Sequence, residues 1–395
     1  MKIFLAVAAG LFALALLLPL IHSATGWPAD LPLRGVEDAV PPPDLRWGAW
    51  WDGDMQTGID TWLNRHIGLR GRWVRAANQI RYSLFRELPR GSGTKVVPGR
   101  QGYLFEKGYV DAYRQAGRSP ESEWRATSAA VRRLQDRLAE DGIAFLLVIA
   151  PSKAEIYPEF LPKDADVAGR PFRRSNYENA IGTLRQDGVN VLDAHQLFLD
   201  WKQEAGTPPL FTQSGTHWNH YAIARVAGQL MERLRDLTGK DLPSLRVTGA
   251  EIDREIVGAD NDLGDLANLW SRRQLAGPQI HPVLEALPGT EPPDILFVCD
   301  SFGLRLTDLM TRNRLYRRQD TYYYYATHAA WPRPRAPSPE MDQRKQDLPG
   351  ELAGRDAVVI VEVETFLPRI GFGFVDDLLK AYDARDAAKA ANAAP

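Results

Sequence analysis

Four short, mainly apolar runs, interrupted only by Asn190 and Glu362, constrain the fold of this chain more than any other feature. They span residues 145–149, 189–192, 295–298 and 357–363. Helical segments lie between them, such as residues 221–237, whose apolar positions recur every three or four residues. Apolar runs of this length are typical of parallel strands that are buried on both faces. The alternation therefore predicts an α/β fold, with a parallel sheet and helices on both of its faces.

The N-terminus reads as an export segment. Lys2 precedes a nearly continuous apolar run over residues 3–21. This pattern is that of a signal peptide, and a weak cleavage site follows at residues 21–23. The run also approaches the roughly 20 residues that span a bilayer, so a retained membrane anchor is the favoured alternative.

The remainder is predicted to form a linker, one large domain and a tail. Residues 25–53 contain Pro41, Pro42 and Pro43 and are expected to be a linker. Residues 54–383 form the predicted domain, and the Ala-rich residues 384–395 a flexible tail, while residues 1–24 are the export segment. Two amphipathic helices are expected near the start of the domain, with apolar positions 59, 62, 63 and 67, and then 73, 77, 80 and 84.

Charge and composition exclude several functions. Lys and Arg number 48 against 50 Asp and Glu, and no basic run stands out, so we expect no nucleic-acid partner. No glycine-rich phosphate loop is present, and no cofactor is expected. Cys299 is the only cysteine, so no internal disulfide can form. His217 and His220 are too few to predict a metal site.

Ser301 and His217 are the best candidates for chemistry. Ser301 follows the apolar run 295–298 and precedes a helical stretch, which places it where reactive groups gather in α/β sheets. A serine hydroxyl needs a base, usually a neutral imidazole, and His217 stands just before a predicted helix that Asn219 can cap. The structural alternatives are that Asp300 or Ser301 only caps a helix, and that His217 only packs beside Trp218.

Five stretches of the chain, taken in order, resemble one known family. The resemblance is to the SGNH hydrolase-like proteins of the alginate O-acetyltransferase type. It is most specific at the histidine and serine blocks, and it extends over about residues 50–370. The stretches are 99–105 (GRQGYLF), 151–162 (PSKAEIYPEFLP), 215–218 (GTHW), 263–266 (LGDL) and 300–302 (DSF).

The resemblance implies a fold, a reaction and partners. The fold is a flavodoxin-like three-layer α/β/α sandwich with a parallel central sheet. A membrane-bound O-acyltransferase donates an acetyl group, which passes through an acetyl-serine at Ser301, with His217 as base, to a secreted polysaccharide. The implied location is the periplasm, with attachment to the inner membrane through the N-terminal segment if it stays uncleaved. Gly303, Lys153 and Tyr157 are the expected oxyanion or substrate contacts. For Lys153, a solvated turn is the equal alternative.

One departure from the family's sequence pattern leaves the identity of the triad's acidic residue open. Many members carry Asp two residues before the histidine, where this chain has Gly215. The candidate acids from other strand ends are Asp193, Glu155, Glu362 and Glu364. Loss of the acid can slow a triad by up to roughly 10⁴. Two alternative functions therefore stay open: a polysaccharide acetylesterase, and a catalytically idle binding or scaffold subunit of an exopolysaccharide secretion complex.

Overall fold

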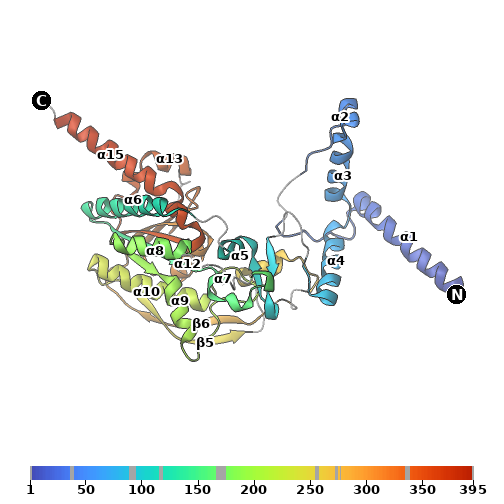
Figure 1. Cartoon of the computed structure of the whole chain (residues 1–395), viewed down its shortest axis with the longest axis horizontal. Helices are drawn as coiled ribbons and strands as arrows, with labels where there is room; N and C mark the ends of the chain where they lie inside the picture. Colours follow the sequence, from blue (N-terminus) through green and yellow to red (C-terminus); the bar gives the residue numbers. More distant parts are fainter. Residues whose placement is uncertain are drawn as a thin grey trace. The chain divides into compact units, whose positions relative to one another are not determined.

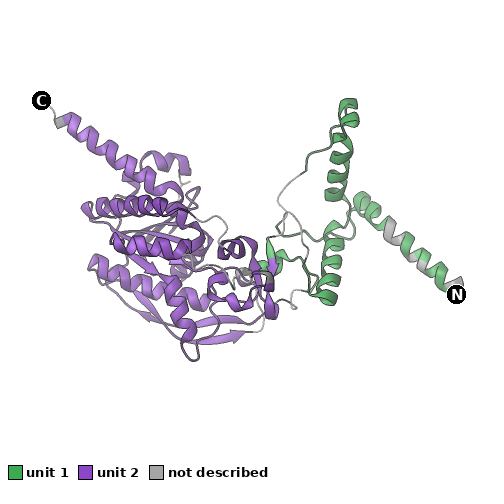
Figure 2. Ribbon diagram, viewed as in Figure 1, with its two compact units in different colours: residues 1–96, 263–275 green, residues 97–262, 276–395 purple. Residues whose placement is uncertain are grey.

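The chain divides into two compact units in the computed structural model. One unit comprises residues 1–96 with 263–275, and the other comprises residues 97–262 with 276–395 (Figure 2). The structure describes residues 2–393 except 36–39, 89–94, 115–118, 166–174, 254–257, 272–274, 276 and 334–338.

A six-stranded sheet forms the centre of the second unit, in the order β4-β3-β10-β7-β8-β9. Adjacent strands are parallel except β9, which runs antiparallel to β8. Each of the four predicted strands is present, as β3, β4, β7 and β10. The bounds are β3 Ala144–Ala150, β4 Val191–Asp193, β7 Asp294–Cys299, β8 Arg318–Tyr323, β9 Thr327–Trp331 and β10 Ala357–Val363.

Helices cover both faces of this sheet, which confirms the predicted α/β/α sandwich (Figure 1). One layer holds α9 (Ala194–Gln203), α10 (His220–Thr238) and α12 (Ser301–Arg312). The other holds α6 (Glu121–Glu140), α8 (Asn176–Gln186) and α15 (Phe374–Ala393). Alternate residues of β3, β7 and β10 enter opposite cores, as a strand buried on both faces requires. The last parallel strand, β10, lies between β3 and β7, whereas the flavodoxin-like order 2-1-3-4-5 places the last strand at the edge of the sheet.

Smaller elements surround the sheet. The strands β5 (Ser244–Asp253) and β6 (Gln279–Leu287) form an antiparallel pair, and β1 (Val96–Pro98) and β2 (Leu104–Glu106) form a separate two-stranded sheet. The short helices are α5 (Lys107–Tyr113), α7 (Lys153–Ile156), α11 (Asp262–Leu266), α13 (Met341–Gln346) and α14 (Leu348–Glu351). The expected tail continues α15 as far as Ala393, and residues 394 and 395 lie outside the described residues.

The first unit contains the N-terminal helices. They are α1 (Lys2–Thr25), α2 (Trp47–Asp52), α3 (Asp54–His66) and α4 (Arg70–Phe85). Both predicted amphipathic segments are helical, as α3 and α4. Among the residues that the structure describes, no helix combines the length and apolar character needed to cross a membrane.

A buried ion cluster joins β8 to its neighbours. Asp320 on β8 accepts a hydrogen bond from Arg355, which precedes β10, and its Oδ1 lies 2.6 Å from His328 Nε2 on β9. Burial alone would raise the pKa of Asp320, but the hydrogen bonds from His328 and Arg355 lower this pKa well below its usual value. The carboxylate is therefore ionised and stabilises the fold over most of the pH range.

Replacing Asp320→Asn is expected to lower the free energy of unfolding at neutral pH by about 3 kcal/mol, because Arg355 would be left charged and buried. The stabilisation is present above the ordinary carboxyl pKa of 3.8 and is lost as pH falls below it. Urea unfolding of the wild-type protein and the variant should therefore give different free energies of unfolding at neutral pH, and this difference should disappear on acidification. Asp308→Asn, which removes an exposed pair with Arg312, should cost no more than about 0.5 kcal/mol. Equal effects of the two substitutions would contradict this account.

Candidate active site

The structure brings Ser301 and His217 together. Ser301 is the first residue of α12, directly beyond the end of β7, and its Oγ lies 2.9 Å from His217 Nε2. Asp300 caps α12, because its Oδ1 accepts hydrogen bonds from the backbone N–H groups of Phe302 and Gly303. The cap thus fixes the helix start that presents the serine.

His217 is positioned by the residues that follow it. Trp218 is fully buried, pairs with Phe211 in an isolated β-bridge, and donates its indole N–H to the Phe302 carbonyl at 3.2 Å. Asn219 accepts a hydrogen bond from the Ala222 N–H and so caps α10, as expected from the sequence. The histidine therefore stands on a segment that is fastened both to α10 and to α12.

The acid beside His217 is Asp262. Its Oδ2 lies 2.6 Å from His217 Nδ1, and its Oδ1 accepts the Thr216 N–H at 2.7 Å. Ser301, His217 and Asp262 thus form the hydrogen-bonded series of a Ser-His-Asp triad. This corrects the sequence analysis, which offered four other acids. The carboxylate comes from the first residue of α11, which is 45 positions beyond the histidine.

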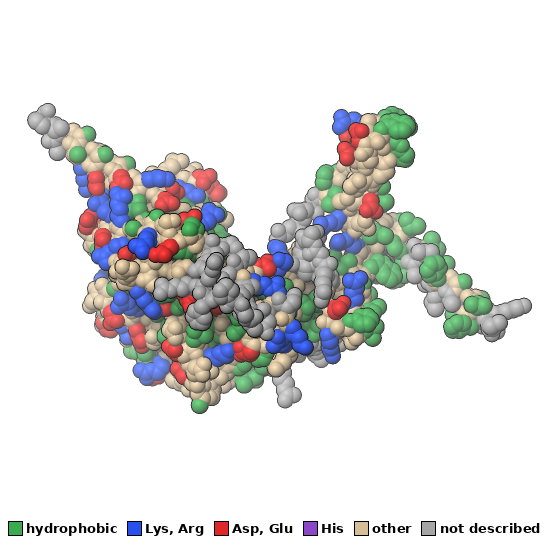
Figure 3. All heavy atoms as spheres, in the orientation of Figure 1, with side chains coloured by type: hydrophobic (Ala, Val, Ile, Leu, Met, Phe, Trp, Pro, Cys, Tyr) green, Lys and Arg blue, Asp and Glu red, His purple; other side chains and the backbone are tan. Residues whose placement is uncertain are grey.

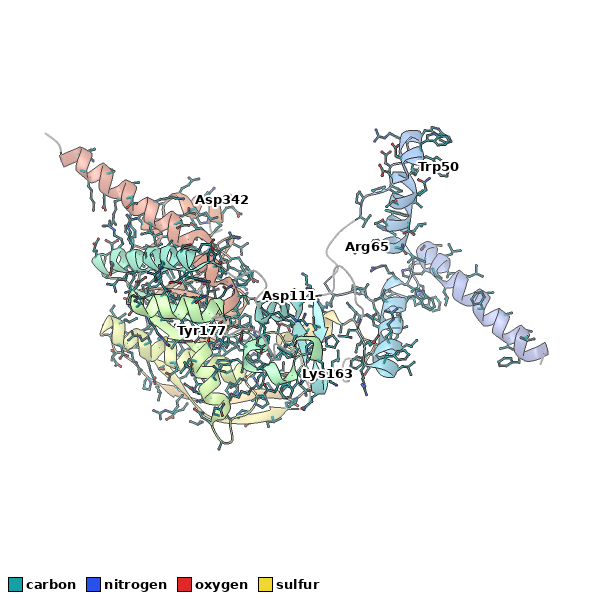
Figure 4. The ribbon with its side chains drawn as sticks, viewed as in Figure 1. Trp50, Arg65, Asp111, Lys163, Tyr177 and Asp342 are labelled. Carbon is teal, nitrogen blue, oxygen red and sulfur yellow. The ribbon has the colours of Figure 1, made fainter. Side chains whose placement is uncertain are left out.

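Two of the acids suggested from the sequence belong to a separate buried cluster. Glu364, after β10, accepts the Ser152 N–H at 2.9 Å and hydrogen bonds His195. Glu155 on α7 lies near Glu364. Burial, and then the charge of Glu364, raise the pKa of Glu155 to about 8. Tyr177 of α8, labelled in Figure 4, stacks on the His195 ring with centroids 3.8 Å apart. These acids therefore surround His195.

The other two suggested acids are also engaged elsewhere. Asp193 caps α9 and accepts hydrogen bonds from Tyr177 and Arg185. Glu362 is fully buried in β10 and accepts the Gly371 N–H at 3.1 Å. Burial raises the pKa of Glu362 well above its usual value. Neither residue is a partner of His217.

Gly215 is what lets the chain carrying Asp262 reach the histidine. A Cβ atom at this position would lie 2.8 Å from the carbonyl oxygen of Asp260 and 2.6 Å from the Thr212 hydroxyl. Any side chain here would therefore displace the 260–262 segment. Gly215 stands where many family members carry the acid, and its lack of a side chain leaves room for the 260–262 segment. Asp262 directly precedes the 263–266 stretch that resembled the family, and that adjacency was the available signal.

Asp260 fastens the same segment to both helices of the site. It is fully buried, and its carboxylate pairs with Arg305 of α12 at 2.6 Å and with His220 of α10 at 3.1 Å. Burial alone would raise the pKa of Asp260, but the hydrogen bond from His220 and the charge of Arg305 hold it below its usual value. Residues 260–262, which include the acid Asp262, are therefore connected to α10, which follows the base His217, and to α12, which carries the nucleophile Ser301.

Lys153 and Tyr157, expected as substrate contacts, have internal roles instead. The Lys153 ammonium donates to the carbonyls of Thr212 and Gln213, both at 3.1 Å, and to that of Gly215. The side chain is buried, and burial lowers its pKa to about 7. The Tyr157 hydroxyl accepts the N–H of Leu210 at 3.0 Å. Both residues thus brace the chain that leads to His217.

Gly303 serves close packing. Its N–H donates to Asp300, and a Cβ atom here would lie 2.4 Å from Cys299 Cβ. Besides His217, Tyr324 is a polar residue near Ser301 that lies outside α12. Burial raises the pKa of its phenol, and the nearby Ser301 opposes this shift. Tyr324 stands in a run of four tyrosines, 322–325, and nothing in the sequence distinguishes it from its neighbours in that run.

The residues that the structure describes contain no group of three or more His, Cys, Asp or Glu side chains placed to hold a metal ion. A hydroxyl, an imidazole and a carboxylate in series are suited to nucleophilic acyl transfer.

The fold and the site together define an SGNH hydrolase-like protein. A family model described as "SGNH hydrolase-like domain, acetyltransferase AlgX" matches residues 96–297, about half of the chain. The chain therefore belongs to this family, as the resemblance indicated.

Three proteins illustrate the similarity. The chain is 28% identical over 164 residues to the probable alginate O-acetylase AlgJ of Pseudomonas aeruginosa. That match covers 41% of this chain and 38% of the relative. The O-acetyltransferase domain of Pseudomonas putida AlgJ superposes with a TM-score of 0.44 at 20% identity, over 69% of this chain and 92% of that one. Pseudomonas aeruginosa AlgX gives a TM-score of 0.42 at 17% identity, over 71% and 66% of the two chains.

Ser301 is expected to react with phenylmethylsulfonyl fluoride, because His217 can take up the proton of its hydroxyl. Asp262→Ala should slow this labelling by roughly 10²- to 10⁴-fold, since the imidazole loses its orienting partner. Asp193→Asn, which changes an acid outside the site, is the matched control and should label at the wild-type rate. The measurement is the time course of the mass increase by intact-mass spectrometry. An unchanged rate in the Asp262 variant would refute the assignment of the acid.

Proposed function

We propose that this protein transfers an acetyl group to a hydroxyl of a secreted polysaccharide through an acetyl-serine at Ser301. The observation that carries the proposal is the continuous series of hydrogen bonds from Ser301 through His217 to Asp262. Membership of a family described as acetyltransferases supports acetyl as the group transferred. The name of the AlgJ relative, an alginate O-acetylase, supports a polysaccharide acceptor.

In the first half-reaction the acetyl group moves to the enzyme. His217 Nε2 takes the proton of Ser301 Oγ as this oxygen attacks the acetyl carbonyl carbon. Asp262 holds the Nδ1–H and stabilises the imidazolium that results. The Ser301 backbone N–H belongs to the first turn of α12, where helical hydrogen bonds leave such groups free, and we assign it as a donor to the oxyanion. Collapse of this intermediate breaks the bond to the donor's oxygen, which leaves with the proton from His217.

The second half-reaction repeats these steps with a sugar hydroxyl as nucleophile. His217 accepts the proton of that hydroxyl, the new ester bond forms, and Ser301 leaves with the proton returned. Water in place of the sugar would make the protein an acetylesterase, with the same three residues. The two reactions therefore differ only in which hydroxyl reaches the acetyl-serine.

The donor and the location follow from the same proposal. We assign the acetyl donor to a membrane-bound O-acyltransferase and the site of action to the periplasm, in keeping with the apolar N-terminal segment. The inner membrane is the surface at which the two proteins would meet. The idle-scaffold alternative rested on a missing acid, and Asp262 removes that support because it fills the acid's position.

Incubation with a chromogenic acetyl ester should add the mass of one acetyl group to the wild-type protein. Ser301→Ala should abolish the adduct, and Asp262→Ala should lower its rate of formation by at least about 10²-fold. Ser271→Ala, which removes a hydroxyl outside the site, is the control and should behave as wild type.

Added oligosaccharide acceptors then separate the two reactions. Acetylated sugar as the product supports the transferase, and free acetate alone establishes the esterase. A folded protein that gives no adduct and no turnover would overturn the proposal in favour of a scaffold subunit.

A further inference from the structure

Helix α4 has two opposite faces, and its apolar face is the exposed one. Its buried residues are Gly71, Arg75, Asn78 and Tyr82. The stripe at residues 73, 77, 80 and 84 has the same spacing but is displaced by two residues, so it lies about 200° around the helix. Within that stripe Trp73 is 45% exposed, Ile80 58% and Leu84 69%. An amphipathic helix packed on its own protein would show the reverse.

The polar face is turned inward because it makes specific hydrogen bonds. Arg75 donates to the carbonyls of Pro32 at 2.8 Å and Leu269 at 3.3 Å, and Asn78 donates to the carbonyl of Ala267 at 3.1 Å. At the start of the helix, the Asp30 carboxylate accepts the N–H groups of Gly71 and Arg72. These contacts fix the rotation of α4 about its own axis. The stripe is thus held outward by hydrogen bonds to the opposite face.

Cations accompany the exposed stripe. The sequence of α4 contains four arginines and no Asp or Glu, and Arg86 follows directly. Of these, Arg81 and Arg86 are exposed, next to Ile80, Leu84 and the 66% exposed Phe85. Figure 3 shows hydrophobic side chains at the surface of this unit with Lys and Arg beside them. The neighbouring helices α2 and α3 bury no residue, and Trp50 stands out from α2 (Figure 4).

We propose that the exposed face of α4, formed by Trp73, Ala77, Ile80 and Leu84 with Arg81 and Arg86, docks on a membrane surface that bears anionic phospholipid headgroups. An apolar stripe with a tryptophan enters the headgroup boundary, and flanking arginines pair with the lipid phosphates. A second copy of the chain fits less well, because an isologous contact would bring two acid-free, arginine-rich helices together. The contact is independent of the acetyl-transfer chemistry.

A fluorophore attached at position 80 of α4 tests whether this face of the helix contacts the membrane. Cys299 is fully buried and its thiol pKa is raised by burial, so Ile80→Cys can be labelled selectively in the full-length protein with an environment-sensitive maleimide. Vesicles of phosphatidylcholine mixed with phosphatidylglycerol should shift the emission to the blue, and added salt should reduce the shift. Pure phosphatidylcholine should give little change. Ile252→Cys, at an exposed apolar position of the β5–β6 pair, is the matched control and should not respond.

Two further variants make the outcome decisive. Arg81→Gln combined with Arg86→Gln should weaken binding to the anionic vesicles by about fivefold for each arginine. Trp73→Ser combined with Leu84→Ser should weaken it by at least about tenfold, and folding should persist because these side chains are exposed. Equal responses to both vesicle types, or no effect of these variants, would overturn the proposal. A wild-type dimer that the serine variant converts to monomer would identify a second copy as the occupant and equally overturn it.

Discussion

The catalytic triad depends on the hydrogen bond between His217 Nδ1 and Asp262. Without it, the site beyond β7 would contain only a serine beside a histidine. The hydrogen bond forms because the 260–262 segment is fastened on several sides. Asp260 pairs with Arg305 and His220, and Thr212 donates its hydroxyl to the Asp260 carbonyl. Lys153 braces the opposing loop through three carbonyl groups. A buried ammonium and a buried carboxylate thus hold the two loops whose ends must meet.

The glycine at position 215 and the acid at position 262 are structurally linked, because the segment that carries Asp262 packs against Gly215. In the pattern that the chain resembles, the acid stands two residues before the histidine. Here that position is glycine, and a side chain would collide with Asp260. Moving the acid to a second loop keeps the geometry that an imidazole needs, namely a carboxylate at Nδ1 and a hydroxyl at Nε2. The cost is that the acid's position now depends on tertiary contacts, and Asp260 and Thr216 supply those contacts.

The parts of the fold and of the active site that depend on local sequence patterns could be predicted. The runs 145–149 and 295–298 are strands, and Ser301 and His217 could be singled out because each stands at the end of an element. Asp262 could not be found this way, since its partner is remote in sequence and four other acids also end strands or start helices. The period of α4 predicted a helix, but only the hydrogen bonds of Arg75 and Asn78 decide which face is buried. The insertion of β10 between β3 and β7 leaves no mark in the order of apolar runs.

The most direct test of this account is NMR of protein labelled at the histidine ring nitrogens. We expect the His217 ring to carry a strongly hydrogen-bonded, downfield-shifted proton on Nδ1, assigned by its absence in His217→Gln. Asp262→Ala should remove that shift, while the signal of His195, which bonds Glu364, stays unchanged. A His217 proton located on Nε2, or one whose shift survives Asp262→Ala, would contradict the central claim.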